Sequence, residues 1–177
     1  MVSDAGPLIH LAQIGKLHLL KKVFSQVTIT LKVKREAYDD GVKLGHPDAQ
    51  AIGKAIEEGW IMIEDVPKSL ASASKRLAES EKISLTDAET LLFARRKRAE
   101  ILVDEKALSN LARMFGLKTW NTWTVLLECL RMGFIELFDI EAAVKELGEK
   151  RHKLKKEEAA QILEAAKLIA RLRRVVE

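Results

Sequence analysis

Acidic residues stand at four places in this sequence where a carboxylate could serve a catalytic site. Two end expected strands, one lies within an expected helix and one stands at an expected helix start; in chain order they are Asp4, Glu36, Asp87 and Asp104. Glu105 directly follows the last of them. Carboxylates brought close together repel one another in a low dielectric, and a hard divalent cation relieves that repulsion. Oxygen-only ligands favour Mg²⁺ or Mn²⁺, which can activate a bound water to hydrolyse a phosphodiester.

A phosphodiester substrate requires cations around such acids, because the carboxylates would otherwise repel it. The basic candidates for contacts to a phosphate backbone are Lys32, Lys34, Arg35, Arg95, Arg96 and Arg98. Ordinary roles compete with each assignment. Asp87 and Asp104 can cap helices, which stabilises a helix by about 1 kcal/mol. Glu36 can be an exposed helix acid, and the arginine cluster suits the end of a helix dipole.

The elements that must position these residues alternate between strands and helices. Apolar or β-branched runs predict strands over 2–3, 27–30, 60–66, 100–104 and 117–120. Helical spacing predicts helices over 5–14, 16–24, 31–38, 48–58, 68–80, 85–98, 105–115, 123–132, 140–147 and 156–176, with breaks at Gly41, Gly45 and Pro47. This order is typical of an α/β/α sandwich with a central, mainly parallel sheet. In such sheets the ligand site lies at the carboxyl ends of the strands.

Length and composition indicate one main domain. The chain has 177 residues, of which 47% are hydrophobic, and carries a net charge of +4. This length is enough for one core. We expect a domain over residues 1–138 and a C-terminal helical extension over 139–177. The extension would pack on the domain or on a second copy of the chain in a homodimer.

Other features narrow the class of protein. No apolar run approaches the roughly 20 residues of a membrane span, and the N-terminus lacks the pattern of a signal peptide, so we expect a cytoplasmic protein. The single cysteine, Cys129, lies in an apolar run and is expected to be a buried thiol. The four histidines show no metal-ligand spacing and are expected to be structural or surface groups; they are His10, His18, His46 and His152.

Taken together, the acid-centred segments resemble the PIN-domain nucleases, and in particular the small prokaryotic VapC-like toxin ribonucleases. The resemblance rests on eight stretches, namely Val2–Ile9, Ile14–Leu17, Val33–Glu36, Leu85–Glu89, Leu102–Glu105, Gly116–Lys118, Asn121–Thr122 and Gly133–Ile135. They cover about the first three quarters of the chain, and their order and spacing are more specific than any one of them.

This resemblance implies a PIN-like fold and an endoribonuclease that depends on Mg²⁺ or Mn²⁺, with RNA as its substrate. For the toxin ribonucleases it also implies an antitoxin protein as partner. Residue by residue, the catalytic acids of the family match Asp4, Glu36 and Asp87, and the fourth falls on Asp104 or Glu105. The implied metal ligands are Asp4, Asp87, Asp104 and Glu105.

The sequence departs from the family pattern at two places. Val103 stands where a hydroxyl residue often precedes the fourth acid, and Asn121 stands where glycine is more usual, although Thr122 is retained. Glu89 is a second candidate beside Asp87. These departures leave the ligand set open between neighbouring acids.

Two other classes of protein are alternatives. One is a non-catalytic PIN-like module that binds RNA or a protein. The other is an unrelated α/β phosphotransfer protein, but a phosphatase of that kind usually has a second Asp where this chain has Gly6. A receiver domain needs a lysine after its last strand, where this chain has Asn121–Thr122.

Overall fold

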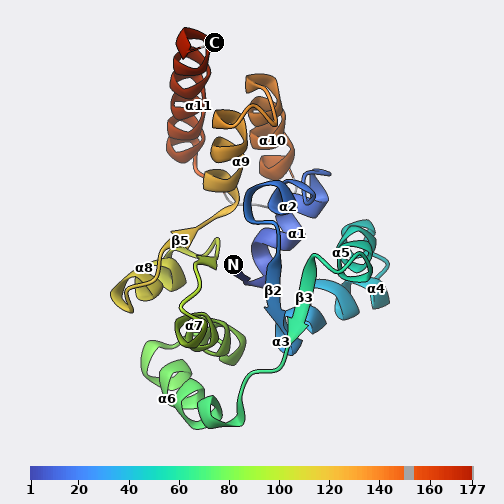
Figure 1. Ribbon diagram of the computed structural model, residues 1–177, viewed down its shortest axis with the longest axis vertical. Helices are drawn as coiled ribbons and strands as arrows, with labels where there is room; N and C mark the ends of the chain where they lie inside the picture. The colour runs from blue at the N-terminus through green and yellow to red at the C-terminus, as the bar shows by residue number, and fades with distance from the viewer. Residues whose placement is uncertain (150–153, 177) are drawn as a thin grey trace.

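Five short strands form one parallel sheet in the computed structural model, which describes residues 1–149 and 154–176 (Figure 1). Their order across the sheet is β3-β2-β1-β4-β5, and every neighbouring pair is parallel. The strands are β1 (Val2–Ser3), β2 (Val27–Thr30), β3 (Ile61–Glu64), β4 (Ile101–Leu102) and β5 (Thr119–Trp120). The predicted α/β fold with a parallel central sheet is confirmed.

Helices cover both faces of this sheet. They are α1 (Ala5–Gln13), α2 (Leu19–Phe24), α3 (Leu31–Lys34), α4 (Asp40–Lys43), α5 (Pro47–Glu57), α6 (Ala71–Glu81), α7 (Leu85–Lys97), α8 (Lys106–Met114), α9 (Thr122–Arg131), α10 (Leu137–Glu149) and α11 (Lys156–Val176). A π-helical segment, η1 (Arg35–Asp39), joins α3 to α4, and a 3₁₀ turn, η2 (Lys68–Leu70), precedes α6. Within the described residues, no helix is long and apolar enough to cross a membrane.

The core divides into two layers because successive strand residues point to opposite faces. On β4, Leu102 belongs to the larger cluster, which is built with α1, α2, α5 and α9. Ile101 and the following Val103 belong to the smaller one, which is built with α7 and α8. All three side chains are fully buried. The segment Ile101–Val103 is therefore apolar on both faces, as expected for a parallel sheet that is covered on both sides.

The strand order places a topological switch point between β1 and β4. The chain leaves β1 toward β2 and β3 on one side, and β4 leads to β5 on the other. Val2 pairs with Ile101 and Ser3 with Leu102, so the two strands end level with each other. Ligands in open α/β sheets bind outside the carboxyl ends of strands at such a point. Asp4 and Asp104 follow these two strands there.

The helix after β2 is longer than its sequence predicts. The prediction of a break at Gly41 is wrong, because the helical backbone runs on through η1 and α4 to Lys43. A Cβ built on Gly41 would lie 2.8 Å from the Cβ of Ala49 on α5. The glycine therefore allows α4 and α5 to approach closely and does not end a helix.

The C-terminal helices pack on the same core as the sheet. Ile140, Ala143 and Leu147 of α10, together with Ala166 of α11, belong to the larger hydrophobic cluster. Figure 1 shows α9, α10 and α11 grouped at one end of the molecule, with α6 and α7 at the other. The guanidinium of Arg173 holds α11 by donating to the carbonyl of Leu130 at 3.1 Å.

The predicted boundary between a domain at 1–138 and an extension at 139–177 stays a prediction. Among the side chains of α11 that the structure describes, those of Leu168, Leu172 and Val175 are large, apolar and exposed. The expected homodimer also stays a prediction. His152 lies outside the described residues. Cys129 is buried as expected, and burial raises the pKa of its thiol to about 11.

The close approach at Gly41 can be tested with two alanine substitutions. Alanine is the better helix former, so Gly148→Ala, where nothing lies within 4 Å of the added Cβ, should raise the free energy of unfolding by about 0.5–1 kcal/mol. Gly41→Ala should instead lower it by about 1–3 kcal/mol because of the clash with Ala49. Urea unfolding followed by circular dichroism measures both. An increase for Gly41→Ala would contradict the packing described here.

Candidate active site

Asp4 is a largely buried carboxylate, and no cation is among the groups that shift its pKa. It occupies the N-cap position of α1 with an extended backbone, but its side chain makes no capping hydrogen bond. Burial raises the pKa of Asp4 to about 6, the nearby charges of Asp87 and Glu36 add to that rise, and the backbone amides of Ala5 and Gly6 oppose it. The charged form of Asp4 is therefore unfavourable in the chain by itself.

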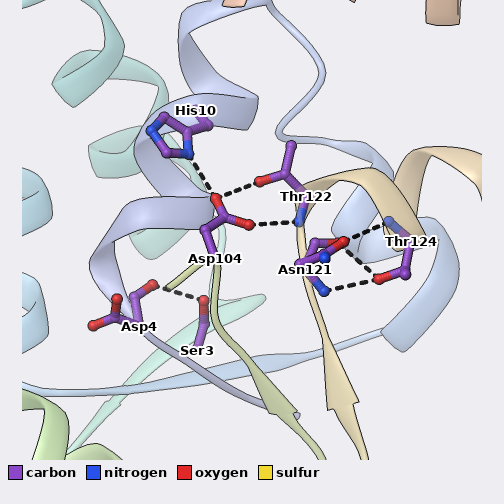
Figure 2. A network of polar contacts seen from close by, with 7 residues as sticks. All are labelled: Ser3, Asp4, His10, Asp104, Asn121, Thr122 and Thr124. Carbon is purple, nitrogen blue, oxygen red and sulfur yellow. Dashed lines mark hydrogen bonds and ion pairs between the residues drawn. The ribbon is translucent and has the colours of Figure 1, made fainter. Parts of the chain in front are cut away.

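Asp104 lies in a different environment, a network of hydrogen bonds at the head of α9 (Figure 2). Its Oδ2 contacts Nδ1 of His10 at 2.6 Å and accepts from the hydroxyl of Thr122 at 2.7 Å. Its Oδ1 accepts from the backbone N–H of Thr122, also at 2.7 Å. The carboxylate thus joins the end of β4 to α1 and to the first turn of α9.

This network reverses the effect of burial. Burial alone would raise the pKa of Asp104, but the hydrogen bonds from His10 and Thr122 outweigh it and hold the pKa below its ordinary value. An ionised carboxylate only accepts hydrogen bonds, so Nδ1 of His10 carries the proton in this contact. The N-terminus of α9 further favours a negative charge at this place. Asp104 is therefore ionised and already compensated.

Gly6 separates the two acids. A Cβ built on this residue would lie 3.8 Å from Oδ2 of Asp4 and 4.0 Å from the Cβ of Asp104. Figure 2 shows the two carboxylates pointing apart, that of Asp104 toward His10 and Thr122 and that of Asp4 away from them. A side chain at Gly6 would thus be in van der Waals contact with both acids.

Glu36 and Asp87 approach the same edge from other elements. Glu36 is exposed within η1, and its Oε1 accepts a hydrogen bond from the hydroxyl of Thr86 at 2.6 Å. Asp87 closes a capping box with Ser84 in the first turn of α7. Both carboxylates lie close enough to Asp4 to raise its pKa. The structure therefore gathers Asp4, Glu36 and Asp87, and the expectation that Asp87 can act as a helix cap is also met.

The neighbouring acids that the sequence left open lie differently. Glu105 is exposed at the start of α8, whereas the side chain of Asp104 is only 13% exposed. Glu89 accepts from the ammonium of Lys32 at 2.6 Å. Of these acids, Asp104 is the one enclosed at the switch point.

The predicted cations fall into two groups. In α3 and η1, close to Glu36 in sequence, Lys32 pairs with Glu89, Lys34 pairs with Asp39 at 2.7 Å, and Arg35 is exposed. The other group, Arg95, Arg96 and Arg98, is exposed at the far end of α7. The rise of an α-helix places these arginines about 12–17 Å along the axis from Asp87. The first group lies within four residues of Glu36 in sequence, whereas the second is remote from Asp87.

The acids do not close into a metal site. Within the residues that the structure describes, no three His, Cys, Asp or Glu side chains lie close enough to hold a metal ion. The donor chemistry nevertheless suits a hard cation, because Asp4 is buried beside two other carboxylates and no cation is among the groups that shift its pKa.

Comparison with known proteins identifies the fold and the family. The sequence model of a family described as "PIN domain" matches residues 1–168. The chain belongs to the PIN-domain family. The crystal structure of PAE2754 from Pyrobaculum aerophilum is similar to this PIN domain at a TM-score of 0.52 and 17% sequence identity. That match covers 72% of this chain and 86% of the other. No curated protein matches the sequence.

Membership has a general functional meaning. PIN domains are generally nucleases and typically use divalent metal ions, so membership indicates a nuclease-type function for this chain. The predicted family is confirmed. Its closer likeness to toxin ribonucleases stays a prediction, as do the ligand set and the RNA substrate.

Sequence reasoning missed the part that His10 plays. The sequence predicts that His10 is a structural or surface residue. No sequence pattern connects His10 with Asp104, which lies 94 residues away. One local signal exists. His10 stands four residues after Gly6 and so lies on the same face of α1, one turn further on. The position of His10 on this face indicates a contact with Asp104 only once the end of β4 is known to lie beside α1.

The environment of Asp4 predicts how stability depends on pH without added metal. Its folded pKa is raised from 3.8 to about 6, so the unfolded state ionises first and Asp4 costs stability as pH rises through this range. Asp4→Asn should therefore stabilise the protein by up to about 3 kcal/mol above pH 6 and by nothing below pH 4. Urea unfolding in EDTA across this range measures the difference. A destabilised variant at pH 7 would contradict the assigned environment.

The contact between His10 and Asp104 predicts energetic coupling. A double-mutant cycle with His10→Ala and Asp104→Asn should give a coupling energy of about 1–3 kcal/mol at pH 7. Since the pKa of Asp104 is lowered, its contribution is present at pH 7 and is lost as pH falls below about 4. The more exposed pair Lys34–Asp39 is the control and should couple by less than about 1 kcal/mol. Additive effects at the His10 pair would contradict the network.

Proposed function

We propose that this PIN domain is a metal-dependent endoribonuclease that hydrolyses RNA phosphodiester bonds at the carboxyl edge of its sheet. Asp4, Glu36, Asp87 and Asp104 are the proposed catalytic acids, with Asp4 at their centre. Mg²⁺ or Mn²⁺ is the proposed cofactor, and RNA the proposed substrate.

The single observation that carries the proposal is the burial of Asp4 beside other carboxylates, with no cation among the groups that shift its pKa. A carboxylate that is buried beside the charges of Asp87 and Glu36 costs free energy unless it serves a ligand. Its place at the switch point between β1 and β4 is where α/β sheets bind ligands. Membership in a family of nucleases supports the same interpretation.

The residues that would hold a divalent ion are Asp4, Asp87 and Asp104. When bound there, the ion would lower the pKa of a water and neutralise charge on phosphate oxygens. Oδ1 of Asp104 accepts one hydrogen bond in the structure and keeps a second lone pair for a ligand. His10 and Thr122 would hold that carboxylate in one orientation. We assign the fourth acid to Asp104 in preference to the exposed Glu105.

The surrounding cations would bind the RNA backbone. Arg35 precedes Glu36 in η1 and is exposed, so we assign it to a phosphate contact. Lys32 and Lys34 would exchange their present carboxylate partners for phosphate. The cluster of Arg95, Arg96 and Arg98 lies too far from Asp87 to contact the phosphate that is cleaved. We therefore assign these arginines to contacts with the phosphate backbone further along the RNA strand.

The experiment is RNA cleavage by the full chain with and without Mg²⁺ or Mn²⁺. Asp4→Asn should keep the fold and reduce the rate of cleavage at least about 100-fold. Loss of a residue that only orients a metal ligand already costs about 10- to 100-fold, and loss of the ligand itself should cost more. Glu79→Gln, an exposed acid on α6, is the matched control and should keep full activity. Glu105→Gln should cleave within about threefold of the wild type, whereas a loss as large as that of Asp4→Asn would move the fourth acid to Glu105.

Cleavage that persists in Asp4→Asn, or that ignores EDTA, would contradict the proposal. RNA binding without turnover in any divalent ion would instead support the non-catalytic module. The sequence resemblance also supports a role as the toxin of a pair controlled by an antitoxin protein. The same two chains test that role, since expression of the wild type should arrest growth and expression of Asp4→Asn should not.

A further inference from the structure

A cavity of about 610 Å³ lies next to the proposed catalytic edge, and Asp104 is one of its lining residues. Its walls come from α8, the first turns of α9, and α11. A volume of this size is within the range of small-ligand sites. Since Asp104 forms part of its lining, a group bound there lies beside the place where the phosphodiester would be cleaved.

The two long walls of this cavity differ in chemistry. The α8 wall carries the cations Lys106 and Arg113. The Nε of Arg113 donates to the hydroxyl of Thr119 at 3.0 Å, which leaves the terminal nitrogens of the guanidinium as further donors. Cations on one wall favour a phosphate group there.

The α11 wall carries a carboxylate, an amide and apolar groups, which are Glu158, Gln161, Ile162 and Ala165. A carboxylate repels phosphate, so the backbone of a nucleic acid would keep to the α8 side. An amide both donates and accepts hydrogen bonds, and the apolar groups beside it offer a surface for a ring. Single-stranded RNA is recognised by this combination of base-edge hydrogen bonds and apolar or stacking contacts.

We propose that this cavity binds the base of a nucleotide adjoining the bond that is cleaved, and that Gln161 of α11 reads the edge of that base. The phosphate of the same nucleotide lies over Lys106 and Arg113. This inference rests on the proposed ribonuclease function and deepens it. The C-terminal helix then has a specific task, which is to complete a base-selecting pocket for the nuclease.

The first test fills the cavity. Ala165→Phe places a ring in the space, whereas Ala160→Phe places the same ring on the exposed side of α11 and is the matched control. The probes are AMP, GMP, CMP and UMP, titrated calorimetrically into the full chain in EDTA. At least one should bind the wild type and the control, and Ala165→Phe should weaken that binding at least about 10-fold. Equal weakening by both substitutions would overturn the proposal.

The second test measures the base preference of RNA cleavage and does not require a bulky substitution. Gln161 is exposed, so Gln161→Ala should keep the fold. Sequencing the products of a random RNA pool should show a base preference at one position beside the cut, about five- to tenfold in the wild type and lost in Gln161→Ala.

The outcomes separate this proposal from the proposed function. RNA cleavage without any base preference, together with no binding of the four nucleotides, would overturn the pocket and leave the ribonuclease standing. Nucleotide binding that Ala165→Phe removes, in a chain that cleaves no RNA, would support the pocket and contradict the ribonuclease. Binding of peptides but of none of the four nucleotides would overturn the pocket as a base site.

Discussion

The burial of two carboxylates at the ends of adjacent parallel strands is the constraint on which the rest of this structure depends. Because β1 and β4 pair in parallel and end level with each other, Asp4 and Asp104 leave the sheet at the same edge. Both acids lose water there, but His10 and Thr122 compensate Asp104, whereas the charges of Asp87 and Glu36 oppose the ionisation of Asp4. One acid is therefore satisfied within the chain, and the other is the basis of the proposed metal site.

The compensated acid also connects the parts of the molecule. Asp104 joins the end of β4 to α1 through His10 and to α9 through Thr122. Since α9 packs against α11, the same joint helps to place the C-terminal helix beside the catalytic edge. The proposed base pocket lies between α8 and α11, with Asp104 in its lining. Cleavage and base selection would thus share one carboxylate.

The uncompensated acid illustrates the conflict between stability and function. A chain selected only for stability would not bury Asp4 near Asp87 and Glu36, because each charge raises the cost of ionising the next. Sites that bind cations accept this cost, since the ligand offsets it when it binds. Because the carboxylates repel one another when no cation is bound, they need not lie within coordination distance of one point in the metal-free protein.

The sequence by itself determined the alternation of strands and helices, the parallel sheet and the capping box at Asp87, because these depend on periodicity or on residues three apart. It misjudged Gly41, since a local rule reads glycine as a break while the approach of α4 to α5 requires the missing Cβ. Only the tertiary structure decided that His10 and Thr122 compensate Asp104 and that Asp4 is buried beside other carboxylates. Burial and partners come from elements distant in sequence, and no local pattern records which of them will meet.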